Sequence, residues 1–365
     1  MDTESYVLPV REVIRETADA CSIAFDLTDE AAGKFDYKPG QFLTLAVPSD
    51  QTGLVARCYS LSSSPVGDQP LTVTVKRTVE GYASNWLCDN LKAGDTLRVL
   101  PPSGIFTPAN LDADLLLFAG GSGVTPIISI ARTALQKGSG KIVVFYANRD
   151  QDSVIFAEEW ARLSAENPDR LIVVHWLESV QGLPTQDQLK AFAATFSSYT
   201  SFCCGPAPFM KAVSTALREL EFPRERRHQE KFVSLGGNPF GDVEELRQAE
   251  ADLAAADDAD EPGDAADDGP SFGPVKVEVE LDGDGWTFED WDGKKLLLEY
   301  LEEKGVPAPF SCREGNCSAC ACVVLEGDLS MKHNEVLDKA DLDDGIRLTC
   351  QAQAQSETLK ISFNG

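Results

Sequence analysis

The sequence predicts a multidomain chain with an antiparallel β-barrel, an α/β domain built on a doubly wound parallel sheet, and a smaller α+β domain. Residues 1–110 contain short segments with alternating β-branched residues and few helical stretches, which is typical of a small barrel. Strand-like and helix-like segments alternate over residues 111–240, as in a doubly wound sheet. A low-complexity acidic segment, 241–273, precedes renewed strand-like sequence over 274–365. We therefore expect three domains with a flexible linker before the last.

The individual elements follow from apolar runs and from residue type. The barrel should include strands over 41–47 and 71–76, where β-branched residues alternate with others. A transient helix is expected within the linker, over 244–256. The remaining expected elements are strands 115–119, 141–146, 170–176, 201–204 and 275–281, and helices 127–137, 153–165, 186–196, 207–220 and 296–303.

Charge and hydropathy exclude several classes of function. The formal net charge is −27, and a chain so acidic is a poor ligand for nucleic acid phosphates. Residues 241–272 hold twelve acidic residues against one basic, and residues 273–365 hold nineteen against nine. This acidic end suits docking to a basic partner face, although it also fits a plain solvated surface. The chain shows no apolar run of transmembrane length and no secretory signal, so we expect a cytoplasmic monomer without membrane insertion.

Four of the ten cysteines have the spacing of an iron–sulfur site. Cys312, Cys317 and Cys320 follow a C-x4-C-x2-C pattern, and Cys350 comes later in the chain. This is the plant-type [2Fe–2S] arrangement, in which one tight loop supplies three thiolates and a separate segment supplies the fourth. Structural zinc sites prefer two C-x2-C pairs, which a single fourth cysteine does not provide. The segment from about residue 274 to the end resembles a plant-type ferredoxin domain, which implies a β-grasp-like fold.

The first domain contains a motif that indicates a flavin site. Arg57-Cys-Tyr-Ser60 resembles the R-x-Y-S flavin motif of the ferredoxin–NADP reductase superfamily. The resemblance implies that Arg57 neutralises the FAD diphosphate, that Tyr59 lies against the flavin, and that Ser60 bonds near its N5 atom. It also places Val75 and Lys76 at the flavin edge.

A second motif, Gly81-Tyr-Ala-Ser84, precedes an expected helix over 85–91. A helix N-terminus with a glycine and a capping serine attracts anions, because its backbone N–H groups lack partners. Gly81 and Ser84 are therefore predicted to hold the second part of the FAD diphosphate.

The second domain contains a glycine-rich turn between its first strand and first helix. The segment 120–126, Gly-Gly-Ser-Gly-Val-Thr-Pro, lets the backbone approach a diphosphate at a helix N-terminus. It resembles the G-x-G-x-x-P form of the same superfamily, with Pro126 where a dinucleotide fingerprint has glycine. We predict that Gly121, Gly123, Thr125 and Pro126 contact a nicotinamide nucleotide.

Two further segments complete the predicted hydride-transfer centre, and a third bears on the choice of nucleotide. Cys204 belongs to a C-G-P motif whose cysteine, by resemblance, lies near the nicotinamide and the flavin. Glu230 and Phe232 resemble the E-x-F segment that closes this domain in related reductases. Arg149 suits a 2′-phosphate, whereas Asp150 would repel one. These residues therefore leave the choice between NADH and NADPH open.

The order flavin, nicotinamide, cluster covers nearly the whole chain and resembles the reductase components of actinobacterial 3-ketosteroid 9α-hydroxylases. The resemblance rests on segments 55–60, 76–78 with 81–88, 146–150, 175–179 and 309–315. It implies FAD, a [2Fe–2S] cluster and NADH rather than NADPH as cofactors, and a separate Rieske-type oxygenase of steroid degradation as the partner. Ser60, Cys204 and Glu230 would be the catalytic residues.

Two alternatives remain within the same class of enzyme. These are the reductase of phenylacetyl-CoA epoxidase and a reductase of an aromatic-ring oxygenase. A third alternative, from another class, is an iron–sulfur redox sensor.

Overall fold

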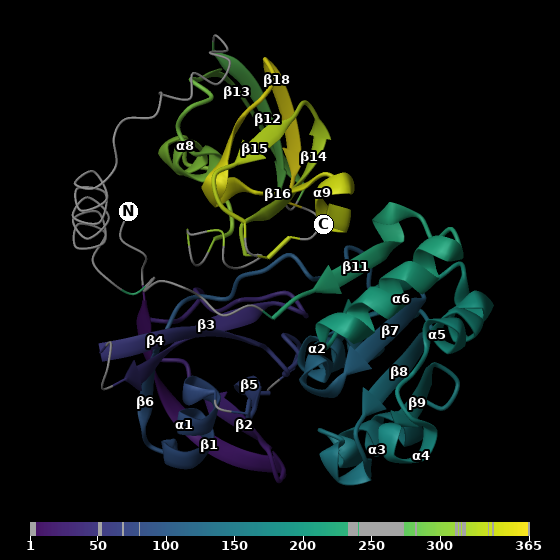
Figure 1. The fold of residues 1–365 in the computed structure, drawn as a ribbon. Helices are drawn as coiled ribbons and strands as arrows, with labels where there is room; N and C mark the ends of the chain where they lie inside the picture. The colour runs from purple at the N-terminus through teal and green to yellow at the C-terminus, as the bar shows by residue number, and fades with distance from the viewer. Residues whose placement is uncertain are drawn as a thin grey trace, which may run out of the picture. The chain divides into compact units, whose positions relative to one another are not determined.

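The computed structural model describes residues 5–49, 53–67, 69–79, 81–232, 240, 274–281, 283–310, 313, 315, 319–334, 336–337 and 339–363. The chain divides into two compact units (Figure 1). One unit comprises Val7–Val47 and Arg57–Ser234, and the other Met1–Tyr6, Pro48–Ala56 and Leu235–Asn364. The predicted linker 241–273 and the helix expected at 244–256 lie outside the described residues.

The first predicted domain is a six-stranded antiparallel sheet with strand order β4-β3-β6-β1-β2-β5. An antiparallel bridge between Leu61, just after β4, and Val73 of β5 joins the two edge strands, so the sheet closes on itself as the predicted barrel does. The elements are β1 (Tyr6–Thr17), β2 (Ala20–Phe25), β3 (Phe42–Ser49), β4 (Gly53–Ser60), β5 (Leu71–Lys76), helix α1 (Tyr82–Asn90) and β6 (Thr96–Val99).

The second predicted domain is a five-stranded parallel sheet with order β11-β10-β7-β8-β9. Every residue of β7 is buried, as expected for a parallel strand covered on both faces. Helices α2 and α3 pack on one face of the sheet, and α5 and α6 pack on the other (Figure 1). The elements are β7 (Leu115–Gly120), α2 (Val124–Lys137), β8 (Ile142–Asn148), α3 (Ala157–Glu166), β9 (Leu171–Leu177), α4 (Glu178–Gln181), α5 (Gln186–Ala193), β10 (Thr200–Cys204), α6 (Ala207–Glu219) and β11 (Arg227–Glu230).

Helix α3 begins later than the sequence predicts. Gln151–Ser153 form a short 3-10 turn, because the Asp150 carboxylate accepts hydrogen bonds from Ser153 N (2.9 Å) and Ser153 Oγ (2.6 Å). Phe156 then has a φ of 62°, a left-handed conformation that an α-helix does not contain. The predicted helix 153–165 therefore starts at Ala157. The predicted helix 186–196 likewise ends in a separate 3-10 turn, Ala194–Phe196.

Helix α2 connects the parallel sheet to the segment that follows β4. Ser129 Oγ donates to Ser63 O at 2.6 Å, and the Arg132 guanidinium donates to Ser62 O at 2.6 Å. The Ser64 hydroxyl bonds Thr133 Oγ1 (3.1 Å) and Gln136 Oε1 (2.8 Å). The helix that starts at the glycine-rich turn is thus fixed to the chain that runs on from the R-x-Y-S motif.

Acid pH should destabilise the parallel sheet through His228. Its ring stacks on Phe202, with ring centroids 4.5 Å apart, and burial assisted by Arg224 lowers the pKa of His228 from 6.5 to about 4. The imidazole of His228 therefore takes up a proton at a higher pH in the unfolded chain than in the folded one. The free energy of unfolding has its full value above pH 6.5 and decreases as the pH falls toward 4. The loss across that window is about 3 kcal/mol.

Urea unfolding at neutral pH and near the acid end of this window measures the effect. We expect His228→Phe to remove most of the acid-induced loss. Burial also lowers the pKa of His175 on β9, so His175→Phe should remove a smaller part of it. Equal acid sensitivity of both variants and the parent chain would show that His228 is not the responsible group.

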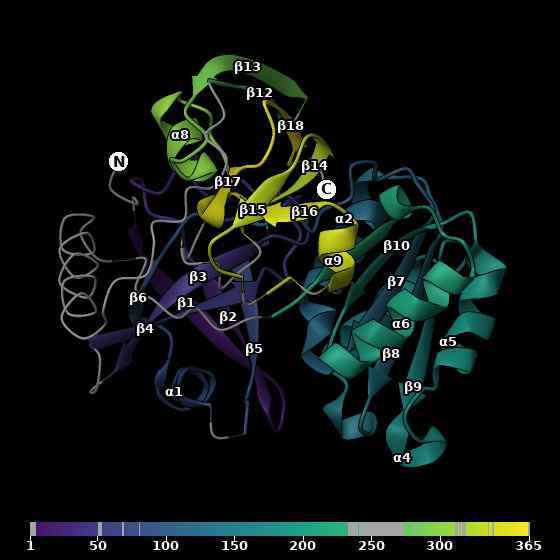
Figure 2. The same cartoon turned by 45° about the horizontal axis from the view of Figure 1, so that its top comes forward.

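The third predicted domain contains a mixed five-stranded sheet with order β13-β12-β18-β14-β16 (Figure 2). Strands β12 and β18 are parallel and the other pairs are antiparallel. Trp291 anchors this core, because its buried ring stacks on Tyr300 and its indole N–H donates to Lys295 O at 3.0 Å. The elements are β12 (Val275–Leu281), β13 (Asp284–Trp291), α8 (Leu297–Glu303), β14 (Ala321–Glu326), β15 (Leu329–Met331), α9 (Lys339–Asp343), β16 (Ile346–Leu348), β17 (Ala352–Ala354) and β18 (Thr358–Ser362).

Candidate functional site

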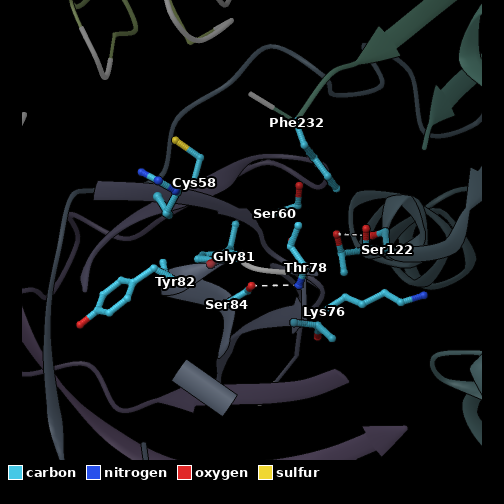
Figure 3. A pocket seen from close by; sticks show the side chains of 14 residues that line it. Cys58, Ser60, Lys76, Thr78, Gly81, Tyr82, Ser84, Ser122 and Phe232 are labelled. Carbon is cyan, nitrogen blue, oxygen red and sulfur yellow. Dashed lines mark hydrogen bonds between the residues drawn. The ribbon is translucent and has the colours of Figure 1, made fainter. Parts of the chain in front are cut away.

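A cavity of about 330 Å³ brings together most of the residues predicted to bind flavin (Figure 3). Phe232 lies over Ser60, and the Lys76 side chain extends toward the side of the cavity where Ser122 lies. The lining residues come from β4, β5, the start of α1, the glycine-rich turn with α2, and the segment after β11. They are Arg57, Cys58, Tyr59, Ser60, Thr74, Lys76, Thr78, Gly81, Tyr82, Ala83, Ser84, Ser122, Thr125 and Phe232.

The chemistry of this lining fits a large anionic cofactor. Arg57 and Lys76 supply positive charge, none of the lining residues is acidic, and eight of them carry hydroxyl groups. Ser60 is buried, and burial raises the pKa of Tyr59, so this phenol stays protonated. Phosphate oxygens need cationic and O–H or N–H donors of this kind. The residues present therefore fit a flavin nucleotide with its diphosphate.

The second flavin motif differs from the prediction in its capping. Helix α1 begins at Tyr82 with Gly81 as its N-cap, and no side chain caps it. Ser84 lies inside the first turn, where its Oγ accepts a hydrogen bond from Thr78 N at 3.0 Å. The prediction of a capping serine and of a helix starting at 85 was wrong, because Ser84 bonds the preceding loop. A Cβ on Gly81 would lie 2.8 Å from Thr78 Cβ, which explains the glycine.

A second cavity of about 390 Å³ lies at the carboxyl end of the parallel sheet. Lys76 and Gly121 line it, and a Cβ on Gly121 would lie only 3.7 Å from Lys76 Nζ. Lys76 lines both cavities, so the two sites share one wall. The other lining residues are Gly120, Ala147, Asn148, Arg149, Trp176, Glu178, Leu183, Pro184, Pro206, Pro208 and Phe209.

Asn148 marks the second cavity as a polar binding site. It is 7% exposed, neither polar atom of its amide makes a hydrogen bond of ordinary length within the described residues, and its side chain interacts with the Tyr146 hydroxyl. A buried amide with so little hydrogen bonding is costly unless a ligand completes it. The carboxyl end of a parallel sheet is also where α/β domains bind nucleotides. These features fit a nicotinamide nucleotide.

The predicted hydride-transfer residues Cys204 and Glu230 lie side by side. They are paired in the register of the parallel strands β10 and β11, and both are buried. Burial, reinforced by the nearby Glu230 carboxylate, raises the pKa of Cys204 well above its usual range. Cys204 is therefore a protonated thiol and not a nucleophile.

Glycines allow the two loops of this centre to touch. A Cβ on Gly123 would lie 2.2 Å from Cys204 O, and one on Gly120 would lie 2.8 Å from Pro206 Cδ. A Cβ on Gly205 would lie 3.0 Å from Gly120 Cα. The glycine-rich turn and the C-G-P turn thus pack backbone against backbone.

Three of the predicted cofactor contacts lie behind the cavity walls. Val75 is fully buried, Pro126 is buried in the first turn of α2, and Gly123 packs on the carbonyl of Cys204. None of the three belongs to the lining of either cavity. Their contact with cofactors stays a prediction, and their place in the fold shows how they support the walls.

In the third domain the structure brings two of the four predicted cluster cysteines together. Cys320 precedes β14, Cys350 lies in a 3-10 turn (Thr349–Gln351), and both are buried. Thr349 donates to Cys320 O through both its backbone N–H and its hydroxyl, each at 3.1 Å. Cys312 and Cys317 lie outside the described residues.

The described parts of the cysteine loop are tightly packed. Gly315 has a φ of 73°, and a Cβ there would lie 2.6 Å from His333 O. Gln351, next to Cys350, donates to Arg313 O at 2.8 Å. Two buried thiols beside a loop held in this way fit a cluster with thiolate ligands. Among the described residues no set of three or more His, Cys, Asp or Glu side chains is grouped for a metal ion.

The cavities also contain residues that the sequence did not single out. Cys58, Thr74, Thr78 and Ser122 line the first cavity. Asn148, Trp176 and Glu178 line the second. Only the position of Asn148, just after the predicted strand 141–146, gave a signal, because side chains near the carboxyl ends of parallel strands face the ligand site.

No helix among the described residues has the length and hydropathy needed to span a membrane.

Comparisons with known proteins agree with the three sites. Residues 8–107 match the oxidoreductase FAD-binding domain, residues 117–215 the oxidoreductase NAD-binding domain, and residues 279–355 the 2Fe-2S iron-sulfur cluster binding domain. The fold is similar to that of a solved phthalate dioxygenase reductase, with a TM-score of 0.57 and 22% identity over 98% of both chains. The predicted fold class of an antiparallel, a parallel and a mixed sheet is confirmed.

Two relatives match over nearly their full length. The 3-ketosteroid-9-alpha-monooxygenase ferredoxin reductase component of Rhodococcus rhodochrous is 53% identical, over 99% of this chain and 97% of its own. That of Mycolicibacterium smegmatis is 48% identical, over 98% and 96%. This chain is an oxidoreductase, and it belongs to the family of ferredoxin reductase components of 3-ketosteroid-9-alpha-monooxygenases.

Proposed function

We propose that this chain takes hydride from NADH and delivers single electrons to the Rieske-type oxygenase component of a 3-ketosteroid 9α-monooxygenase. The observation that carries the proposal is the wall shared by the two cavities at Lys76. A nicotinamide nucleotide in the second cavity can thereby reach a flavin in the first. When bound, FAD accepts hydride and releases single electrons, which a [2Fe–2S] cluster can carry onward.

The residues of this chain act mainly by binding and orientation. Arg57 and the N-terminus of α1 bind phosphate charge, and Lys76 adds a cation between the two cavities. Ser60 presents its hydroxyl at the cavity wall, while the Cys204 thiol and the Glu230 carboxylate fill the strand ends next to the C-G-P turn. Phe232 lines the same cavity as Ser60 and lies above it in the view of Figure 3. Such alignment of two reactants is a large part of catalysis in hydride transfer.

Reconstitution with separate oxygenase components tests the choice of partner. We expect NADH-dependent hydroxylation of a 3-ketosteroid when the purified chain is mixed with a ketosteroid oxygenase component. Turnover with the oxygenase of phenylacetyl-CoA epoxidation or with an aromatic-ring oxygenase, and none with the steroid component, would contradict the proposal. A redox sensor predicts slow reduction by NADH, so rapid bleaching of the flavin and cluster spectra would exclude that alternative.

We further propose that NADH is preferred over NADPH because of negative charge around Arg149. The Arg149 guanidinium donates to Asp150 Oδ2 at 3.0 Å and to Ser153 Oγ at 2.8 Å. The Asp19 carboxylate lies 4.0 Å from the same guanidinium, and Glu178 lines the cavity. A 2′-phosphate would have to displace Asp150 and approach further carboxylates.

Removing this charge should shift the nucleotide preference. In Asp150→Asn with Glu178→Gln, the ratio of kcat/KM for NADH over NADPH should fall about tenfold, a change of about 1.4 kcal/mol. Asparagine at 150 retains an oxygen for the Ser153 N–H, so the turn before α3 should persist. Glu158→Gln, at an exposed acid of α3, removes charge away from the cavity and should leave the ratio unchanged. An unchanged ratio in the double variant would contradict the role given to these carboxylates.

A further inference from the structure

Two cysteines of the antiparallel domain form a dithiol pair that electron transfer does not require. Cys21 of β2 and Cys88 of α1 lie 67 residues apart in sequence, yet their sulfur atoms are 3.1 Å apart. Cys21 is buried, whereas Cys88 is partly exposed. One thiol is therefore within reach of a solute, and the other lies directly behind it.

The surroundings favour the thiolate form at Cys88. Contact with Cys21 and the nearby Arg77 and Arg15 guanidinium groups lower the pKa of Cys88, against the opposing effects of burial and of Asp89. Arg77 is held in place because it donates to Asn85 Oδ1 (3.1 Å) and to Asp89 Oδ1 (2.5 Å), both on α1. A low-pKa, accessible thiol next to a second thiol is the arrangement of redox-active cysteine pairs.

The pair also lies next to the flavin cavity. Cys21 is opposite Val75 in the β2–β5 ladder, and Cys88 Sγ contacts Val75 O at 3.9 Å. The phenol of Tyr59, a lining residue of the cavity, interacts electrostatically with both thiols. Helix α1 carries Cys88 near its end and the Gly81–Ser84 turn at its start.

We propose that Cys21 and Cys88 are a modification site for hydrogen peroxide and form a reversible disulfide that ties α1 to β2. The Cys88 thiolate attacks one peroxide oxygen, so that an S–O bond forms, the O–O bond breaks, and the released hydroxide takes up a proton. The Cys21 sulfur, having lost its proton, then attacks Cys88 sulfur, and the second oxygen leaves as water. Two thiols and one peroxide yield one disulfide and two waters, with sulfur oxidised and peroxide reduced.

The proposal goes beyond the proposed electron transfer and does not depend on which oxygenase is the partner. Peroxide is the oxidant considered because flavin sites that perform O₂ chemistry can generate it close by. In a reducing compartment such a disulfide is transient. It responds to the oxidant concentration and is not a permanent structural disulfide.

Peptide mass spectrometry of the full chain with its cofactors tests the site. After a limited dose of hydrogen peroxide and thiol blocking, we expect one linked peptide joining Cys21 to Cys88, lighter by two hydrogen atoms and released by dithiothreitol. Cys58→Ala, which removes a neighbouring cavity cysteine, should still give this link. Absence of the linked peptide while Cys58 or the predicted cluster cysteines are oxidised first would overturn the proposal.

A trapping experiment distinguishes the attacking from the resolving cysteine. In Cys21→Ser, which cannot form the disulfide, dimedone should label Cys88 as a sulfenic acid. In Cys88→Ser at the same dose, Cys21 should stay unlabelled, because it is buried. Retained FAD absorbance in both variants shows that they are folded. Labelling of Cys21 alone, or of neither cysteine, would refute the assignment.

Discussion

Replacing Cys350 with serine is expected to abolish the visible and EPR signals of the [2Fe–2S] cluster, while FAD content and NADH-dependent dye reduction are retained. The Cys350 thiol is buried, and the neighbouring Thr349 bonds the carbonyl of Cys320, which agrees with the prediction that Cys350 is the fourth ligand. Three thiolates do not complete a plant-type cluster. The flavin cavity involves none of these residues, so electron entry should continue while exit to the oxygenase stops.

The matched control for this prediction is Cys322→Ala. Cys322 lies on β14 opposite Arg347, is fully buried, and has a pKa raised by that burial. The sequence predicts it to be a buried thiol and not a ligand, so the alanine variant should keep the cluster spectrum. Because a serine oxygen can also bind iron, Cys350→Ala should accompany Cys350→Ser. A cluster that survives in Cys350→Ala but disappears in Cys322→Ala would reverse the ligand assignment.

Replacing Gly123 with alanine should slow the reduction of FAD by NADH about a hundredfold, the cost of a displacement of about 1 Å at a hydride-transfer site. The new Cβ would lie 2.2 Å from Cys204 O and 2.4 Å from Cys204 C. Both atoms belong to the backbone, so no side chain can rotate away, and the end of β10 must shift. Overpacking of this kind costs about 3 kcal/mol of stability.

Stopped-flow flavin reduction and urea unfolding measure the two effects of Gly123→Ala. Gly285→Ala is the matched control, since the same substitution in β13 meets only Val279 O at 3.9 Å. The control should leave both the reduction rate and the unfolding midpoint close to those of the parent chain. Normal flavin reduction in Gly123→Ala would show that contact between the glycine-rich turn and Cys204 is not required for hydride transfer.

The sequence predicted those parts of the fold that depend on local pattern. The apolar run 115–119 is β7, because a strand buried on both faces needs a continuous apolar sequence. The R-x-Y-S and glycine-rich motifs line cavities, because backbone approach to phosphates restricts residue type. The spacing of the cysteines identified the third domain, because thiolates that converge on one cluster must come from fixed positions.

Features that depend on distant segments could not be predicted. Ser84 was expected to cap α1, yet it bonds Thr78 because the preceding loop folds back over the helix. Asn148 and Glu178 meet in one cavity only after β8 and β9 pair in register. The contact between Cys21 and Cys88 likewise requires the packing of α1 on the sheet. Neither composition nor periodicity indicates which residues far apart in sequence come into contact in the folded chain.

The hydrogen bonds of α2 set a condition for recombining this chain with its relatives. Ser62 and Ser63 contribute backbone carbonyls, which any foreign barrel would also present, but Ser129 and Arg132 contribute side-chain donors. A chimera that joins this barrel to a nicotinamide half without a serine and an arginine at those two places would leave two carbonyls unsatisfied, at about 1–3 kcal/mol each. Chimeras joined within residues 57–232 should therefore be less stable than chimeras joined after residue 232.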